Sequence, residues 1–219
     1  MDFQEVFLKF GKDCDITQLQ NQGLVYCNTV NYFKDLEGDE MRGDEFETAT
    51  VIGTRKDLIL EIWPVDKSAA KTRIATSKIV HHRTSPFGNL YCMYSLNMSK
   101  FSEGEKFYID DRMKKDSEAF LIIKDVPSFL ERLHTAVDKK KLYWEHHMVE
   151  YLDFSDYYGE RTFFQKDKMF KYQNEFRLFI QNDRFDVIQV ELGDISDISI
   201  KLPTSRLDTG FFVKQTITS

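Results

Sequence analysis

The stretch from Phe164 to Ile180, FQKDKMFKYQNEFRLFI, passes from a charged segment into a strand-like alternation that carries a glutamate. Successive side chains of a strand point to opposite faces of its sheet. One face is mostly apolar and is typical of a core, with Tyr172, Asn174, Phe176, Leu178 and Ile180. The other face lines up an amide, a carboxylate and a guanidinium two residues apart, at Gln173, Glu175 and Arg177.

Two interpretations of this polar face remain open. Charged residues mostly lie at protein surfaces, so the three side chains can simply be the solvent face of an amphipathic strand. Alternatively, Gln173 and Glu175 are about 7 Å apart along the strand, a span that one sugar or ribosyl group can bridge. A carboxylate in such a place stabilises an oxocarbenium-like transition state or orients a ribose hydroxyl.

Length and composition favour one large domain over residues 1–219. The chain has 219 residues, 42% of them apolar, with 19 Phe and 10 Tyr against 10 Gly and 4 Pro. This is ample for a hydrophobic core that is rich in aromatic rings. The net charge of −6 argues against nonspecific binding to nucleic acid or to anionic membranes, so specific partners are expected.

The cysteines and the apolar runs indicate a cytoplasmic protein. Cys14, Cys27 and Cys92 are widely separated, and none forms a CxxC or Cys/His pair with zinc-ligand spacing. They read as buried thiols in a reducing compartment. The N-terminus lacks the pattern of a secretory signal, and no apolar run approaches membrane-spanning length.

Periodicity along the chain predicts an α+β domain of strongly twisted mixed or antiparallel sheets with a few short helices. Asp15 is expected to cap a helix that Gly23 closes, and Pro127 to begin another. The uncharged run NLYCMYSL, within 87–97, predicts a central strand buried on both faces. The remaining strand candidates are residues 6–10, 24–27, 49–84, 119–123, 142–154, 185–192 and 195–202.

The segment 35–47, DLEGDEMRGDEFE, packs seven carboxylates around two glycines. We expect a solvated surface loop, because charge runs are usually exposed. Its carboxylates are also possible ligands of Mg²⁺ or Ca²⁺, but they lack the regular spacing of an EF-hand loop. The residues concerned are Asp39, Glu40, Asp44, Glu45 and Glu47.

Two histidine pairs, His81-His82 and His146-His147, suggest a metal site only at first sight. Neighbours on a strand point to opposite faces, so each pair offers one histidine to any one site, and no third ligand is indicated. We therefore predict no metal centre, while one histidine of each pair remains a candidate general acid or base. GxSxG, P-loop, HExxH and GxGxxG motifs are absent from the sequence.

The N-terminal order resembles an uncharacterised bacterial and phage-borne domain family found near defence and abortive-infection genes. The resemblance rests on a strand VFLKF, a helix ending in QNQG, a strand LVYCN and the acidic run VNYFKDLEGDEMRGDEFE. The later block Tyr172 to Arg177 is similar to a second hallmark of that family, an aromatic-x-x-glutamate-x-arginine strand. Together these motifs span nearly the whole chain.

More distantly, the same order of parts is similar to the ADP-ribosyltransferase fold, including the DarT-type nucleic-acid modifiers. That resemblance implies a catalytic glutamate on a late strand, often written Q/E-x-E, which Gln173 and Glu175 match. It also implies an aromatic or hydroxyl residue on a middle strand, for which Tyr94 and Ser95 stand, and a basic residue or histidine on the first strand, here Lys9. A lysine departs from the usual arginine, histidine or asparagine and lacks their planar donors.

Two functions follow as hypotheses. The first is an ADP-ribosyltransferase-like enzyme of bacterial or phage conflict that uses NAD. Glu175, Gln173 and Tyr94 would be catalytic, and Lys9, Arg177 and Ser95 would bind the cofactor. The second is a non-enzymatic defence or counter-defence module that binds a protein or a nucleotide signal, with the acidic loop and the tyrosine-rich loop 154–158 as recognition surfaces. The partners expected are a nucleotide ligand and a protein or nucleic-acid acceptor.

Overall fold

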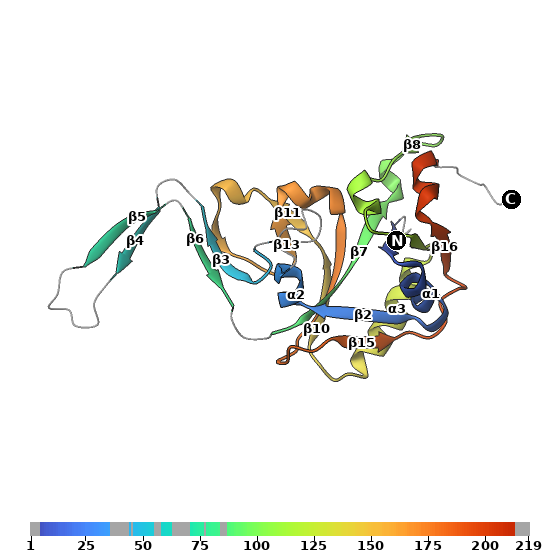
Figure 1. The fold of residues 1–219 in the computed structure, drawn as a ribbon, viewed down its shortest axis with the longest axis horizontal. Helices are drawn as coiled ribbons and strands as arrows, with labels where there is room; N and C mark the ends of the chain where they lie inside the picture. The colour runs from blue at the N-terminus through green and yellow to red at the C-terminus, as the bar shows by residue number, and fades with distance from the viewer. Residues whose placement is uncertain are drawn as a thin grey trace. The chain divides into compact units, whose positions relative to one another are not determined.

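The computed structural model describes residues 5–35, 44, 46–54, 58–62, 71–76, 78–83 and 87–212. Helices and strands are mixed along the chain, and nearly all strand pairs of the described residues are antiparallel (Figure 1). The predicted single-domain α+β class is therefore confirmed. Its residue contacts define two compact units: unit 1 comprises Met1–Thr29, Phe87–Val149 and Tyr172–Ser219, and unit 2 comprises Val30–Pro86 and Glu150–Lys171. The boundaries 1–219 stay a prediction.

Unit 1 is built on an eight-stranded sheet whose main path runs β10-β14-β7-β1-β9-β16, all antiparallel. A further strand, β2, pairs with both β7 and β15. The uncharged strand β7 has neighbours on both edges and is largely buried, which confirms the predicted central strand. The strands are β1 (Glu5–Gly11), β2 (Leu24–Thr29), β7 (Asn89–Asn97), β9 (Ala119–Ile123), β10 (Trp144–Met148), β14 (Glu175–Ile180), β15 (Ile188–Glu191) and β16 (Ser199–Pro203).

The two faces of this sheet carry separate apolar cores. We call the first the helical face, because helices α1 (Asp13–Gln22) and α3 (Val126–Asp138) pack on it, around Phe7, Met93 and Phe176. The second we call the opposite face, where Leu8, Tyr94 and Phe120 cluster with shorter segments of the chain. In addition to these strands and helices, unit 1 contains η1 (Met98–Lys100), β8 (Lys106–Phe107), η2 (Asp111–Lys114), η5 (Thr204–Thr209) and β17 (Phe211–Phe212).

Both helices of unit 1 have identifiable ends. α1 ends at Gly23, as predicted, with a φ of 62° in the left-handed region. A Cβ at Gly23 would lie 2.3 Å from the carbonyl oxygen of Gly193, so only glycine fits. The predicted cap at Asp15 is wrong, since α1 already begins at Asp13. The side chain of Asp125 caps α3 by accepting from the Ser128 amide at 3.1 Å.

Unit 2 consists of small sheets around a core of Phe46, Ala49, Ile52 and Phe154. One sheet has the order β12-β3-β6, one pairs β11 with β13 in parallel, and one is the isolated ribbon β4-β5. Its elements are α2 (Val30–Asp35), β3 (Ala49–Gly53), β4 (Leu58–Ile62), β5 (Thr72–Thr76), β6 (Ile79–His82), β11 (Glu150–Leu152), η3 (Phe154–Asp156), β12 (Tyr158–Glu160), β13 (Gln165–Asp167) and the first part of η4 (Lys168–Gln173).

Two strand predictions need correction. The long strand expected over 142–154 is divided at Val149 into β10 and β11, which pair with different strands. The strand expected from Tyr172 onward begins only at Glu175, because residues 168–173 form the 3₁₀-helix η4. Among the residues that the model describes, no helix is long and apolar enough to cross a membrane.

Candidate functional site

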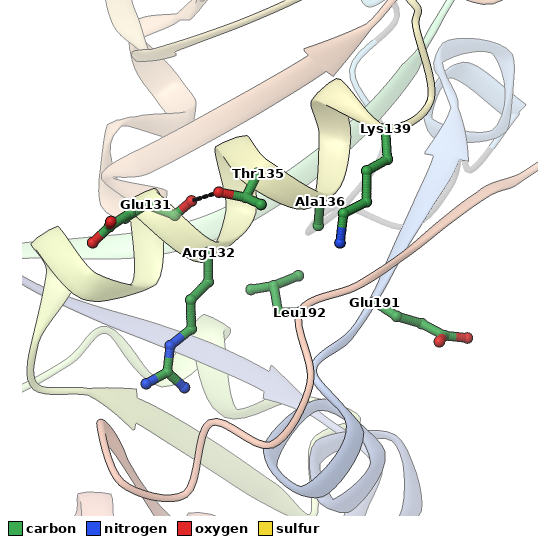
Figure 2. A pocket seen from close by; sticks show the side chains of 7 residues that line it. All are labelled: Glu131, Arg132, Thr135, Ala136, Lys139, Glu191 and Leu192. Atoms are coloured by element: carbon green, nitrogen blue, oxygen red, sulfur yellow. Dashed lines mark hydrogen bonds between the residues drawn. The ribbon is translucent and has the colours of Figure 1, made fainter.

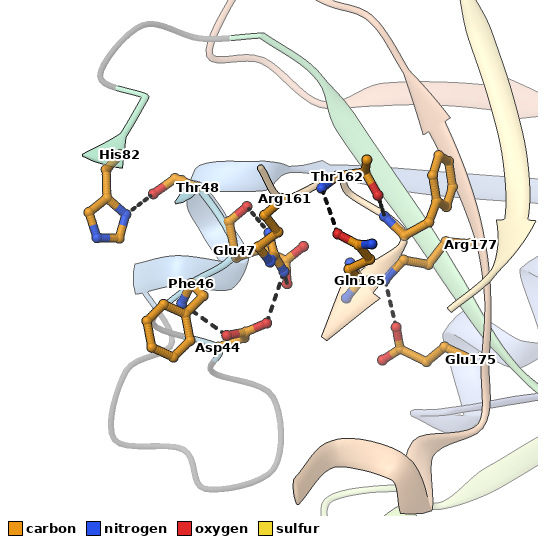
Figure 3. A network of polar contacts seen from close by, with 11 residues as sticks. Asp44, Phe46, Glu47, Thr48, His82, Arg161, Thr162, Gln165, Glu175 and Arg177 are labelled. Carbon is orange, nitrogen blue, oxygen red and sulfur yellow. Dashed lines mark hydrogen bonds and ion pairs between the residues drawn. The ribbon is translucent and has the colours of Figure 1, made fainter. Parts of the chain in front are cut away.

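Glu175 and Arg177 form a buried ion pair on β14. Arg177 Nε donates to Glu175 Oε2 at 2.6 Å (Figure 3). The two residues are only 8% and 1% exposed, and Arg177 is the largest fully buried side chain among the described residues. Since both faces of β14 are buried, the interpretation as a solvent face is wrong. Desolvating two charges costs several kcal/mol per ion, so packing alone does not explain the pair.

The backbone breaks just before this pair. Asn174 has a φ of 38°, in the left-handed region that non-glycine residues rarely adopt. Its carbonyl oxygen accepts from the Ser95 amide at 2.8 Å, and its side-chain amide donates to the Ser95 carbonyl oxygen. Gln173 therefore ends η4 instead of continuing β14. It does not stand two positions from Glu175 on one strand, which corrects the spacing that the sequence predicted.

The register of the sheet decides which predicted residues share a face. Glu175 lies directly opposite Tyr94 of β7, and Tyr94 lies opposite Leu8 of β1. Directly paired residues share a face and their chain neighbours point the other way. Glu175, Arg177 and Tyr94 thus lie on the opposite face, whereas Lys9 and Ser95 lie on the helical face.

Lys9 contacts two residues of β7 on the helical face. Its ammonium donates to the Cys92 carbonyl oxygen at 2.7 Å and sits 4.4 Å from the ring centroid of Tyr91. Tyr91 belongs to the core of the helical face. A sheet separates Lys9 from the Glu175 carboxylate, so a single cleft lined by both residues is excluded by this register.

Tyr94 is the start of a chain of polar and aromatic contacts in unit 1. Burial and, to a smaller extent, the Asp110 carboxylate raise the pKa of the Tyr94 hydroxyl. Asp110 accepts from Arg112 Nε at 2.9 Å and Nη2 at 2.7 Å, and these hydrogen bonds lower its pKa. The guanidinium of Arg112 lies 3.4 Å from the centroid of the Tyr172 ring, and the Tyr172 hydroxyl accepts from Gln173 at 3.4 Å. Sequence reasoning missed Asp110 and Arg112, because no local pattern links them to β7 or η4.

Two described carboxylates of the acidic segment 35–47 do not lie at the solvated surface that we expected. Asp44 and Glu47 are each 1% exposed and flank Arg161, whose Nη2 lies 3.1 Å from Asp44 Oδ2 and 3.7 Å from Glu47 Oε2 (Figure 3). Burial, followed by repulsion from Glu47, raises the pKa of Asp44. Lys166 offsets part of this charge. Asp39, Glu40 and Glu45 lie outside the described residues.

The histidines separate into two settings. His81 and His82 of β6 contact the hydroxyls of Thr50 and Thr48, at 2.7 and 2.9 Å. His146 of β10 instead meets His134 of α3. No group of three or more His, Cys, Asp or Glu side chains in the described residues has metal-binding geometry.

The two tyrosines of the tyrosine-rich loop 154–158 differ in their contacts and exposure. The Tyr157 hydroxyl donates to the Glu160 carbonyl oxygen at 2.8 Å, whereas Tyr158 is 64% exposed. Tyr158 is the side chain of this loop that a partner can reach most easily.

A pocket of about 330 Å³ lies between α3 and the end of β15, and none of the residues predicted from the sequence lines it (Figure 2). Arg132 on its wall already contacts Asp197 and the Asp194 carbonyl oxygen. Its lining carries both signs of charge and comprises Glu131, Arg132, Thr135, Ala136, Lys139, Glu191 and Leu192. We assign this pocket no role in the chemistry, because its charged side chains, on or beside α3 and at Glu191 of β15, are exposed or partly exposed to solvent.

The polar centre on the opposite face therefore contains Tyr94, Glu175 and Arg177, extended through Asp110, Arg112, Tyr172 and Gln173. Comparison of the chain with protein-family models, with curated proteins and with solved structures finds no match.

Proposed function

We propose that unit 1 is an ADP-ribosyltransferase-like module in which Glu175 is the catalytic carboxylate and NAD the cofactor. The observation that carries this proposal is the direct pairing of Glu175 with Tyr94 across β14 and β7, with Arg177 fixed on the carboxylate at 2.6 Å. A buried carboxylate fixed by a guanidinium is preorganised, which is what electrostatic catalysis requires.

The residues on this face fit part of a dinucleotide. NAD supplies the ADP-ribosyl group, and a carboxylate beside the ribosyl carbon favours the positive charge that develops there. Arg112 and Tyr172 offer a planar cation and a ring to a base or a phosphate. Tyr94 and Gln173 offer hydrogen bonds to a ribose. Lys9 and Ser95 do not fit, because they lie on the helical face, so Arg112 and Arg177 take their place in the proposal.

The proposed biological context rests on the sequence resemblances to the defence-associated family and to ADP-ribosyltransferases. They suggest an acceptor, a protein or a nucleic acid, in bacterial or phage conflict. A cytoplasmic location accords with three free cysteines at Cys14, Cys27 and Cys92.

The test is an NAD turnover assay on purified variants. Glu175→Gln keeps the size of the side chain but removes the negative charge. It should lower nicotinamide release at least about hundredfold, as loss of a key electrostatic group does. Tyr94→Phe should retain part of the activity. Glu103→Gln, the same change on an exposed turn, is the matched control. Full activity in a folded Glu175→Gln variant, judged by circular dichroism, would refute the proposal, as would the absence of turnover and NAD binding in the wild type.

A second candidate function has its own observation, the ribbon β4-β5 of unit 2. Leu60 lies opposite Ile74, and both are more than 40% exposed together with Ile62. A two-stranded ribbon is marginally stable alone, and among the described residues no third strand pairs with it. An apolar ribbon with free edges is suited to a partner protein that adds a strand.

This protein-binding function is tested with a photo-crosslinking residue at position 74. We expect one discrete adduct in the native cells, and the purified partner should bind the wild type but not Leu60→Lys. Adducts that Leu60→Lys leaves unchanged, or no adduct at all, would contradict this function.

A further inference from the structure

His134 and His146 meet head to head in unit 1, outside the polar centre around Glu175. Their Nε2 atoms are 2.9 Å apart, and their rings are nearly parallel, with centroids 4.9 Å apart and planes at 19°. One histidine comes from the middle of α3 and the other from β10. Two imidazole nitrogens thus lie within hydrogen-bonding distance of each other between a helix and a strand.

The surrounding side chains hold both rings in this arrangement. Trp144 packs on His134 with centroids 4.8 Å apart, and Phe176 packs on His146 at 5.3 Å. The indole Nε1 of Trp144 donates to Asp138 Oδ1 at 2.8 Å, which fixes the tryptophan itself. A ligand that uses both nitrogens would therefore find the two rings already held close together, which lowers the cost in side-chain entropy.

The separation of the nitrogens selects a coordination geometry. Metal–nitrogen bonds to histidine are about 2.0–2.1 Å long. With 2.9 Å between the two nitrogens, the angle at the metal is about 90°, the cis angle of square-planar and octahedral centres. A tetrahedral ion, with an angle near 109°, would need the nitrogens about 3.3 Å apart.

We propose that His134 and His146 form a two-histidine chelate for a late divalent transition metal of square-planar or octahedral preference, Ni²⁺ or Cu²⁺. Without metal, one Nε2–H donates to the other Nε2. On binding, the donor histidine moves its proton from Nε2 to Nδ1, and the rings turn so that both Nε2 lone pairs point at the metal, which replaces the hydrogen bond.

The surroundings of His146 agree with a neutral ligand at this position. Burial, together with the neighbouring His134 and His147, lowers the pKa of His146, which keeps this imidazole neutral near pH 7. Because no third His, Cys, Asp or Glu in the described residues completes the site, water or a small ligand would fill the other positions. Open positions of this kind are what allow a bound metal to accept a further ligand.

Calorimetry on the untagged full chain tests the site, with Ni²⁺, Cu²⁺ and Zn²⁺ as separate probes. The wild type should bind one Ni²⁺ or Cu²⁺ per chain. His134→Gln and His146→Gln should each weaken binding at least tenfold. His147→Gln, on the other face of β10 from His146, is the matched control and should bind as the wild type does.

The Cu²⁺ complex gives a second measurement that does not depend on affinity. Its electron paramagnetic resonance spectrum should show splitting from two equivalent nitrogens, reduced to one in His134→Gln. Circular dichroism confirms that each variant is folded, and His134→Asn replaces any variant that is not. No binding by the wild type, equal loss in His147→Gln, or tighter binding of Zn²⁺ than of Ni²⁺ would overturn the proposal.

Discussion

Two arginines are buried among the described residues, Arg177 and Arg161, and they differ in how far along the chain their acidic partners lie. Arg177 of unit 1 pairs with Glu175, two residues away on the same strand. Arg161 of unit 2 lies between two carboxylates, Asp44 and Glu47, which are 117 and 114 residues away in sequence. The distant pair of acids ties separate segments of unit 2 together, as a structural cluster does. The ion pair between Glu175 and Arg177 instead joins two positions of one strand, which leaves room for a functional explanation.

The largest effect is expected for Arg161→Met. It leaves two carboxylates buried without their cation, and breaking a buried pair in this way costs about 3–5 kcal/mol of unfolding free energy. Urea denaturation followed by circular dichroism measures the loss. Arg132→Met, which removes a partly exposed pair with Asp197, is the control and should change little. Equal losses in the two variants would remove the distinction between buried and exposed arginines.

Glu175→Gln should cost less, about 1–3 kcal/mol, because the amide oxygen still accepts from Arg177. The same denaturation series gives the value. A loss as large as that of Arg161→Met would mean that the local pair is as structural as the distant cluster, and it would weaken the functional reading of Glu175.

The pH dependence of unit 2 separates burial from ion pairing at Asp44. Burial raises its pKa above the ordinary 3.8, so the folded protein binds this proton more tightly than the unfolded chain does. The stability that Asp44 contributes is then present below about pH 3.8 and is lost as the pH rises through the folded pKa. Relative to Asp44→Asn, the wild type should become less stable as the pH rises above about 3.8 and through the raised folded pKa of Asp44. The reverse trend would show that the pair with Arg161 dominates.

The smallest effect is expected at an exposed pair in the same unit. Lys168 contacts Asp153, which holds the pKa of that carboxyl at about 2, but both side chains are largely in solvent. Lys168→Met should leave the denaturation midpoint unchanged within error, since exposed pairs contribute little. A clearly lower denaturation midpoint in Lys168→Met would show that solvent exposure does not determine how much each ion pair of unit 2 contributes to stability.

Much of the fold could be predicted from local pattern. The uncharged run of β7, the helix stop at Gly23 and the strand-rich middle all follow from nearest neighbours in sequence. The break at Val149 could not be predicted, because it depends on where β10 and β11 find their partners. The start of β14 could not be predicted for a similar reason, because the contact between Asn174 and Ser95, which are far apart in sequence, determines where this strand begins.

The sequence could predict only those residues of the candidate site that lie close together on one strand. Glu175 and Arg177 stand out because two charges interrupt an apolar strand. Lys9 and Ser95 could not be assigned to the correct face of the sheet from the sequence, because their face depends on the register between β1, β7 and β14. Burial of Asp44 and Glu47 depends on Arg161, far along the chain, and an acidic run gives no sign of it.

Hydrogen exchange with and without NAD tests most directly whether the centre at Glu175 binds a ligand while the cluster at Arg161 is structural. NAD should slow exchange in peptides covering η2 and the segment from Tyr172 to Arg177, and leave those covering β3 and β12 unchanged. Glu175→Gln should weaken this protection and Glu103→Gln should preserve it. Protection confined to β3 and β12, or no protection anywhere at saturating NAD, would contradict the assignment.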